Sequence, residues 1–119
     1  MSTVLIADDS MFQRFVLAQV VKDSGHQVLE AKSGQECVEM VLASLPDLIL
    51  LDLNMPVLGG LEVLEALRKN SLHTRAVVIT ADIQTTTKAR CEELGAVAIL
   101  NKPLDEDALR TVLNRLLPA

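Results

Sequence analysis

A chain of 119 residues has room for one domain of ordinary size and not for two. Half of its residues are hydrophobic but only two are aromatic, so the core has to be built from aliphatic side chains. The net charge of −5 and the pI of about 4.9 give it neither the basic surface of a nucleic-acid-binding protein nor the cationic cluster that anionic membranes attract. We therefore expect a single domain over residues 1–119 that binds neither nucleic acid nor membrane.

The chain shows no signal for export or membrane insertion. Its first apolar run, residues 4–7, is interrupted by Asp8 and Asp9, and no stretch approaches the roughly 20 apolar residues of a membrane span. Cys37 and Cys91 are far apart and fit no metal-binding spacing, which predicts two buried or half-buried free thiols. These features predict a cytoplasmic protein.

Five short apolar runs predict strands. They are rich in β-branched and aliphatic residues on both sides of the period-2 pattern, which is typical of strands buried on both faces of a parallel sheet. The predicted strands are residues 3–7, 27–31, 48–51, 76–80 and 97–100.

The segments between these runs have helical spacing. Two of them carry apolar residues at i, i+3, i+4 and i+7, which predicts one apolar stripe facing the sheet. These residues are Val38, Val41, Leu42 and Leu45, and then Leu109, Val112, Leu113 and Leu116. The predicted helix ends are capping boxes at Ser10 with Gln13 and at Ser33 with Glu36, an N-cap at Asp105, and C-caps at Gly25 and Gly95.

The helix predicted around residues 84–94 is the weakest. Its apolar positions are sparse, and the run Thr85-Thr86-Thr87 is β-branched and has poor helix propensity. We expect this helix to be marginally stable and a candidate moving part.

Strands and helices alternate five times, which predicts an α/β protein with helices on both faces of a parallel sheet. Right-handed crossovers leave few topologies, and the flavodoxin-like doubly wound (βα)5 fold with strand order 2-1-3-4-5 is the expected one. In such sheets, ligands bind at the carboxyl ends of the strands, near the switch point between the first and third.

Five polar or charged side chains stand where the predicted strands end. Because parallel strands end at one edge of the sheet, we expect these side chains to converge in one crevice. They are Asp8, Asp9, Asp52, Thr80 and Lys102. Each alone has an ordinary explanation as a cap, a turn residue or a solvated lysine, so it is their joint placement that points to a site.

Three carboxylates in one crevice repel one another, by about 4 kcal/mol per pair at ~4 Å and an effective dielectric constant of ~20. A raised pKa or a bound cation relieves this repulsion, and Lys102 alone does not balance three negative charges. Mg²⁺ is a hard cation that shares oxygen ligands with phosphate, so Asp8 and Asp9 are predicted to hold it. Phosphoryl transfer would then use Asp52 as nucleophile, with Lys102 and Thr80 contacting phosphoryl oxygens.

Four short pieces of sequence carry these residues: Ile6-Ala7-Asp8-Asp9-Ser10, Leu51-Asp52-Leu53-Asn54-Met55-Pro56 with Gly60 following, Ile79-Thr80-Ala81, and Asn101-Lys102-Pro103. In order and spacing they are similar to the receiver domains of two-component response regulators. The resemblance covers essentially the whole chain, because the pieces run from its first strand to its last.

The resemblance implies that Asp52 is the phosphoacceptor, and that the backbone carbonyl of Asn54 joins Asp8, Asp9 and Asp52 as a ligand of Mg²⁺. It implies a sensor histidine kinase as phosphate donor and a downstream protein target reached by protein–protein contact. The chain would not be an enzyme beyond catalysing its own phosphorylation and dephosphorylation. The sequence carries no output domain, which argues against direct DNA binding.

The resemblance also implies that Thr80 and Lys102 are the hydroxyl and the lysine of a conformational switch, and that the Lys102–Pro103 peptide bond is cis. One position departs from the family. Relatives usually carry Tyr or Phe three residues before the lysine, whereas this chain has Ile99. We expect the output signal to be weaker, or to be relayed mainly by the loop after Thr80.

Three alternatives stay open at this stage. The expected protein is a stand-alone receiver, and the alternatives to it are a receiver cut from a larger regulator or hybrid kinase, a degenerate receiver that only binds proteins, and an aspartate-nucleophile phosphatase of the haloacid-dehalogenase type. The complete set of site residues weighs against the second, and the absence of an Asp-x-Asp motif at Asp52 weighs against the third. His26 and His73 are both expected to be solvated.

Overall fold

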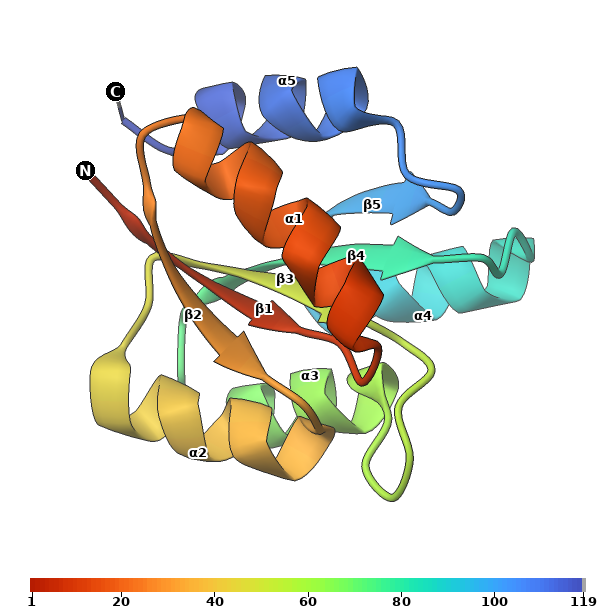
Figure 1. The fold of residues 1–119 in the computed structure, drawn as a ribbon. Helices are drawn as coiled ribbons and strands as arrows, with labels where there is room; N and C mark the ends of the chain where they lie inside the picture. The colour runs from red at the N-terminus through yellow and green to blue at the C-terminus, as the bar shows by residue number, and fades with distance from the viewer. Residues whose placement is uncertain (119) are drawn as a thin grey trace.

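The computed structural model describes residues 1–118, and its strands form a five-stranded parallel sheet (Figure 1). The strand order is β2-β1-β3-β4-β5, which confirms the flavodoxin-like prediction. The strands are β1 (Thr3–Ala7), β2 (Gln27–Ala31), β3 (Leu48–Asp52), β4 (Arg75–Thr80) and β5 (Ala96–Asn101). Register pairs Ala7 with Leu51 and Asp52 with Ile79, so β1, β3 and β4 end at nearly the same level.

Helices cover both faces of the sheet, with α1 and α5 on one face and α2, α3 and α4 on the other (Figure 1). They are α1 (Met11–Asp23), α2 (Gly34–Ser44), α3 (Gly60–Lys69), α4 (Thr85–Glu93) and α5 (Glu106–Leu116). Within residues 1–118, no helix combines the length and the apolar character that crossing a membrane requires.

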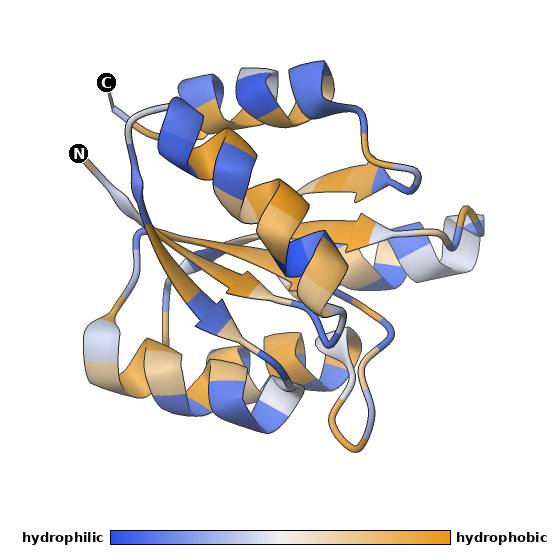
Figure 2. Ribbon diagram, viewed as in Figure 1, coloured by the Kyte–Doolittle hydropathy of each residue, from blue (hydrophilic) through white to orange (hydrophobic). Residues whose placement is uncertain are grey.

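Alternation along the strands divides the core into two layers. Val4 and Ile6 of β1 pack with the apolar residues of α1 and α5, whereas the intervening residues pack toward α2 and α3. Figure 2 shows the hydrophobic residues along the strands and on the helix sides that face them. Phe12 and Phe15 are exposed, so the buried core is aliphatic, as the composition predicts.

The prediction that all five strands are buried on both faces is wrong for β2 and β5. Every residue of β3 is buried, but β2 and β5 mix buried or half-buried residues with exposed ones. The two strands lie at the edges of the sheet, where helices cover less of each face. A period-2 pattern reports on the two faces of a strand and not on its place in the sheet.

The apolar stripe predicted for α2 is also partly wrong. Leu42 and Leu45 are exposed, and Leu45 is the C-cap, with a φ of 46°. The helix instead buries Gly34, Cys37 and Val41, spaced i, i+3 and i+7. A glycine in the buried row carries no hydrophobic signal, so the periodicity favoured a stripe displaced toward the end of the helix. The stripe predicted for α5 is confirmed at its three buried residues, Leu109, Val112 and Leu113.

The predicted helix ends are confirmed in position, but their bonding differs from a capping box. Ser10 and Ser33 accept hydrogen bonds from the N–H groups three residues later. The N–H of Ser10 itself donates to Asp8 Oδ1, where a capping box would use Gln13. Glu36 accepts from the N–H of Lys32 instead of Ser33. The N-cap predicted at Asp105 is confirmed, because its side chain accepts from two N–H groups of α5. The C-caps of α1 and α4 are Ser24 and Leu94, so Gly25 and Gly95, both with positive φ, each lie one residue beyond the predicted position.

His73 is exposed, as expected, but the prediction that His26 is solvated is wrong. His26 is 8% exposed, and its Nδ1 accepts a hydrogen bond from the N–H of Ser2. The backbone of Ser2 also accepts from Gln27 N–H, so the residues before β1 continue the pairing with β2 and cover the ring. This burial comes from a long-range strand contact that local polarity does not indicate.

Both cysteines are buried, as predicted. Burial raises the pKa of the Cys37 thiol to about 12. Cys91 is the one residue of α4 that is buried, while most of the helix is exposed. This confirms that the apolar positions of α4 are sparse, and its marginal stability remains a prediction.

Glycines let the segment after Asp52 pack closely against the sheet. A Cβ on Gly60 would lie 2.6 Å from the backbone oxygen of Asp52, and a Cβ on Gly34 would lie 2.1 Å from that of Leu58. The start of α3 and the start of α2 therefore fix the path of the chain that leaves β3. At the neighbouring Gly59, the nearest atom would be 3.1 Å away.

We expect Gly60→Ala to lower the free energy of unfolding by about 1–3 kcal/mol, because the added methyl group meets backbone that has no room to move. Urea denaturation followed by circular dichroism measures this change. Gly59→Ala is the matched control and should cost less, since its Cβ has more space. Equal destabilisation by the two substitutions would contradict the packing argument.

Candidate active site

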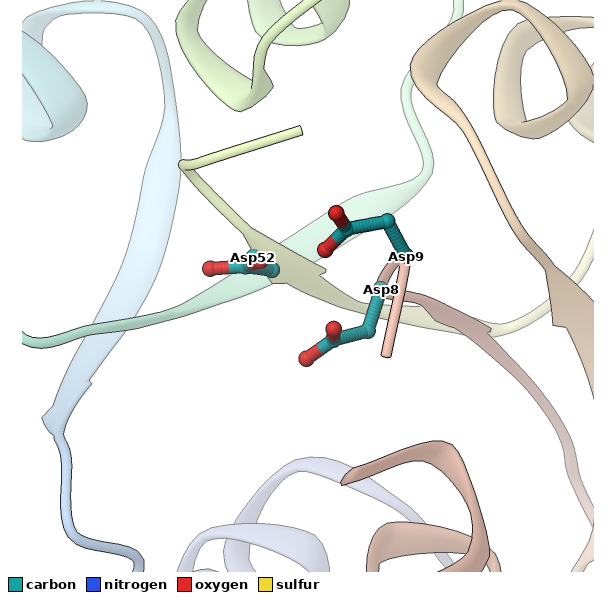
Figure 3. A group of neighbouring side chains, drawn as sticks. All are labelled: Asp8, Asp9 and Asp52. Atoms are coloured by element: carbon teal, nitrogen blue, oxygen red, sulfur yellow. The ribbon is translucent and has the colours of Figure 1, made fainter. Parts of the chain in front are cut away.

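The carboxyl ends of β1 and β3 bring three carboxylates together (Figure 3). Asp8 and Asp9 follow β1, and Asp52 is the last residue of β3. Their carboxylate oxygens lie within 4.8 Å of one another. Asp8 and Asp52 are buried, at 1% and 4% exposure, whereas Asp9 is exposed. The cluster therefore has two buried carboxylates, Asp8 and Asp52, and one that faces solvent, Asp9.

Lys102 brings the positive charge into the crevice. Its Nζ lies 3.3 Å from Asp52 Oδ1 and 3.6 Å from Asp8 Oδ2. The backbone N–H of Lys102 donates to the carbonyl of Thr80 (2.8 Å), which ties the segment after β5 to the end of β4. The Lys102–Pro103 bond that follows is cis, as the resemblance implies. One ammonium is therefore shared between two buried carboxylates.

Asp8 carries the electrostatic strain of the site. Its Oδ1 accepts the Ser10 N–H (2.9 Å), but its Oδ2 is buried and receives no hydrogen bond, since Lys102 at 3.6 Å is too distant. Burial raises the pKa of Asp8 above its ordinary value of 3.8, and the charges of Asp52 and Asp9 raise it further. The Ser10 hydrogen bond and Lys102 act in the opposite direction without cancelling the rise.

This arrangement fits a cation. The buried Asp8 oxygen that accepts no hydrogen bond and the two neighbouring carboxylates form a set of hard oxygen ligands, and a single lysine leaves the cluster negative. The cluster of Asp8, Asp9 and Asp52 could therefore hold a metal ion. The N–H of Asn54, two residues after Asp52, donates to Asp52 Oδ1 (3.3 Å). Metal ligation by the Asn54 carbonyl remains a prediction.

Thr80 is the last residue of β4 and is 1% exposed. Its Oγ1 accepts a hydrogen bond from the N–H of Asp82 (3.0 Å). The Asp82 carboxylate in turn accepts from the N–H of Gln84 and the hydroxyl of Thr87, and these two bonds lower its pKa. Thr80 is thus linked through Asp82 to the start of α4. The sequence analysis missed Asp82, although an Asp two residues before a helix N-cap is a recognisable turn signal.

Ile99 lies on β5, where relatives usually carry an aromatic residue. With Thr80, Asp82, Thr87 and Cys91 it lines a cavity of about 210 Å³ between α4 and β5. The site therefore has an open space beside the Thr80–Asp82 link and no ring to occupy it.

All five predicted site residues gather at one edge of the sheet. The family model of the response regulator receiver domain matches residues 4–114, a span that contains all of them. The chain belongs to this family. It is a receiver domain of two-component signalling, and this membership sets it apart from haloacid-dehalogenase-type phosphatases.

Two curated relatives match along almost their whole length. The chain is 34% identical to protein PilH of Pseudomonas aeruginosa, covering 98% of both proteins. It is 31% identical to sporulation initiation phosphotransferase F of Bacillus subtilis, covering 97% of this chain and 93% of the relative. Among solved structures, the chemotaxis protein CheY4 of Vibrio cholerae superposes with a TM-score of 0.90 at 31% identity, covering 98% of this chain and 99% of that one.

We expect Asp8→Asn to stabilise the protein at pH 7 when no divalent cation is present, by about 1–3 kcal/mol. Because the pKa of Asp8 is raised in the folded state, the folded protein binds this proton more readily than the unfolded chain does. Stability is therefore lost as pH rises through the window above 3.8, and the asparagine removes that loss.

Urea denaturation between pH 3 and pH 7 in EDTA tests this expectation, and the gain should vanish toward the acid end, where Asp8 is protonated in both states. Asp9→Asn is the matched control, because that carboxylate is exposed. An Asp8→Asn protein that is less stable than the unmodified chain at pH 7 would refute the account.

Proposed function

We propose that this chain accepts a phosphoryl group on Asp52 from the phosphohistidine of a sensor histidine kinase, and passes the signal to a protein target by direct contact. The observation that carries the proposal is the buried Asp52 carboxylate, placed 3.3 Å from the Lys102 ammonium and beside an oxygen of Asp8 that accepts no hydrogen bond. A buried nucleophile flanked by a fixed cation and a cation-binding cluster matches the needs of phosphoryl transfer.

In the proposed reaction an oxygen of Asp52 attacks the phosphorus atom of the donor. The new O–P bond forms as the P–N bond to the histidine ring breaks, and the electron pair of that bond stays on the imidazole nitrogen. Lys102 pairs with one phosphoryl oxygen and Thr80 donates its hydroxyl to another. The chain catalyses only this step and the later hydrolysis of its own acyl phosphate.

Asp8, Asp9, Asp52 and the carbonyl of Asn54 are the proposed ligands of Mg²⁺. The bound ion would neutralise charge on the phosphoryl oxygens and on the carboxylates that otherwise repel a phosphate. Oδ2 of Asp8 supports this assignment, since it is buried and accepts no hydrogen bond, and its ion pair with Lys102 spans 3.6 Å.

One receiver domain over residues 1–119 accounts for the sequence, with contacts to proteins rather than to nucleic acid or membrane. Receiver domains also occur inside longer sensory proteins, and a receiver of that kind would carry the same site and chemistry. If this chain is part of a larger regulator or hybrid kinase, its partner differs but the proposed reaction is unchanged.

Incubation with Mg²⁺ and acetyl phosphate should add one phosphoryl group, and peptide mapping by mass spectrometry should place it on Asp52. Asp52→Asn should abolish the modification, while Asp23→Asn, an exposed acid in the last turn of α1, should leave it unchanged. EDTA should prevent labelling of the unmodified chain. Labelling that persists in Asp52→Asn would refute Asp52 as the phosphoacceptor. Labelling that persists in EDTA would refute the role of the metal.

Phosphorylation should change the backbone around residues 81–89 more than the rest of the chain. Thr80 is bonded to Asp82, which holds the start of α4, and α4 has a single buried residue. A phosphoryl group that engages Thr80 shifts the population between two existing arrangements of this segment.

Hydrogen exchange with and without beryllofluoride, a phosphoryl mimic, measures this shift. Altered protection is expected in residues 81–89, with little change in α1 and α5. Asp82→Asn should reduce the difference, because it weakens the bonds to Gln84 and Thr87. Unchanged protection in residues 81–89, with changes confined to other elements, would count against this route.

A further inference from the structure

Arg14, on α1, is a buried charged side chain that the proposed reaction does not use. It is 6% exposed, and arginine is seldom buried to this extent without a partner. We infer that Arg14 is a positioning residue, which fixes the Asp8–Asp9 backbone so that the two carboxylates are held ready for a divalent cation. The inference rests on the proposed function, because it concerns the metal site of that reaction.

The guanidinium makes two contacts of different kinds. Nη1 donates to the backbone carbonyl of Asp8 at 2.8 Å, and this contact is buried. Nε pairs with Glu30 Oε1 of β2 at 3.1 Å, but the Glu30 side chain is 47% exposed. An exposed carboxylate is a weak partner for a buried charge. The buried hydrogen bond to the Asp8 carbonyl is therefore the contact that distinguishes Arg14 from an ordinary surface ion pair.

Asp8 is held at each of its other polar atoms. Its N–H donates to the carbonyl of Ala31 (3.1 Å), its carbonyl accepts from Arg14, and its Oδ1 accepts from Ser10. Oδ2 remains without a hydrogen bond. The peptide that Arg14 grips joins Asp8 to Asp9, so the same bond restrains the direction in which both carboxylates leave the backbone.

A role for Arg14 through its charge and a role through positioning predict opposite effects on Mg²⁺ affinity. A positive group close to a cation site repels the cation, so an arginine that acted only through its charge would weaken Mg²⁺ binding, and its removal would strengthen it. An arginine that orients the ligands would instead strengthen binding. Residues that orient metal ligands typically contribute roughly 10- to 100-fold in affinity.

The experiment is a Mg²⁺ titration of the metal-free chain, followed by calorimetry and by amide chemical shifts in ¹H–¹⁵N spectra, because the chain has no Trp or Tyr to report binding. Arg14→Met keeps the length and removes the donors and the charge, and it should weaken binding by roughly 10- to 100-fold. Arg14→Lys keeps the charge but loses the planar guanidinium, so its Mg²⁺ affinity should lie between those of the unmodified chain and Arg14→Met. Glu30→Gln removes the charge of the exposed partner, and its Mg²⁺ affinity should stay within about fivefold of that of the unmodified chain.

Two controls separate positioning from a general loss of stability. Val21→Ala removes buried volume from the same helix far from the carboxylates, and it should leave Mg²⁺ affinity unchanged while lowering stability. In the metal-free Arg14→Met protein, the amide signals of Asp9 and Ser10 should already be displaced. If Arg14→Met does not fold, Arg14→Lys carries the test and must still weaken binding.

Affinity that is unchanged or tighter in a folded Arg14 variant, or equally weakened in Val21→Ala, overturns the inference. Failure of the proposed function gives a different result, since the unmodified chain would then show no Mg²⁺ binding or no phosphorylation of Asp52.

Discussion

The fold places two carboxylates, Asp8 and Asp52, in a buried crevice with a single ammonium between them. In bulk water the repulsion between such groups is small, but burial removes much of the screening and makes the imbalance of charge consequential. The neighbouring strands β1 and β3 supply the acids, and the segment after β5 supplies Lys102. Neighbouring groups contact the acid with the raised pKa, because the Ser10 N–H donates to the Asp8 carboxylate and the buried Arg14 donates to the Asp8 carbonyl.

The sheet buries one part of the site and leaves another part beside an exposed helix. Asp52 ends a strand that is buried along its whole length, so the proposed nucleophile has little freedom to move. Thr80 also ends a central strand, but its hydroxyl accepts from Asp82 in the loop, which in turn bonds the start of α4, a helix with one buried residue. A chemical change at Asp52 can therefore be expressed as motion on the far side of Thr80 without disturbing the reacting groups.

The order of the strands and the five central site residues could be predicted from the sequence, because strand ends in a parallel sheet are read from simple alternation. The N-cap at Asp105 could be predicted as well, and the end of α4 to within one residue of Gly95, since the signals at helix ends are local. Features that depend on contacts between distant segments could not. The buried His26 needs the Ser2 strand contact, and the buried row of α2 begins with a glycine that packs against Leu58. Arg14 reaches Glu30 on β2, a partner that the fold supplies. Asp82 is different, because its partners lie within five residues of it and its turn signal is local.

The exposure of α4 has a consequence for how this chain changes over time. Cys91 is the one buried residue of α4, so changes at the exposed positions of this helix remove little packing, whereas Asp8, Asp52 and Thr80 of the crevice are buried. Single changes on α4 should therefore alter the surface that the domain presents with little effect on folding. A domain built in this way can keep the chemistry of its crevice while its exposed surface diverges to suit different protein partners.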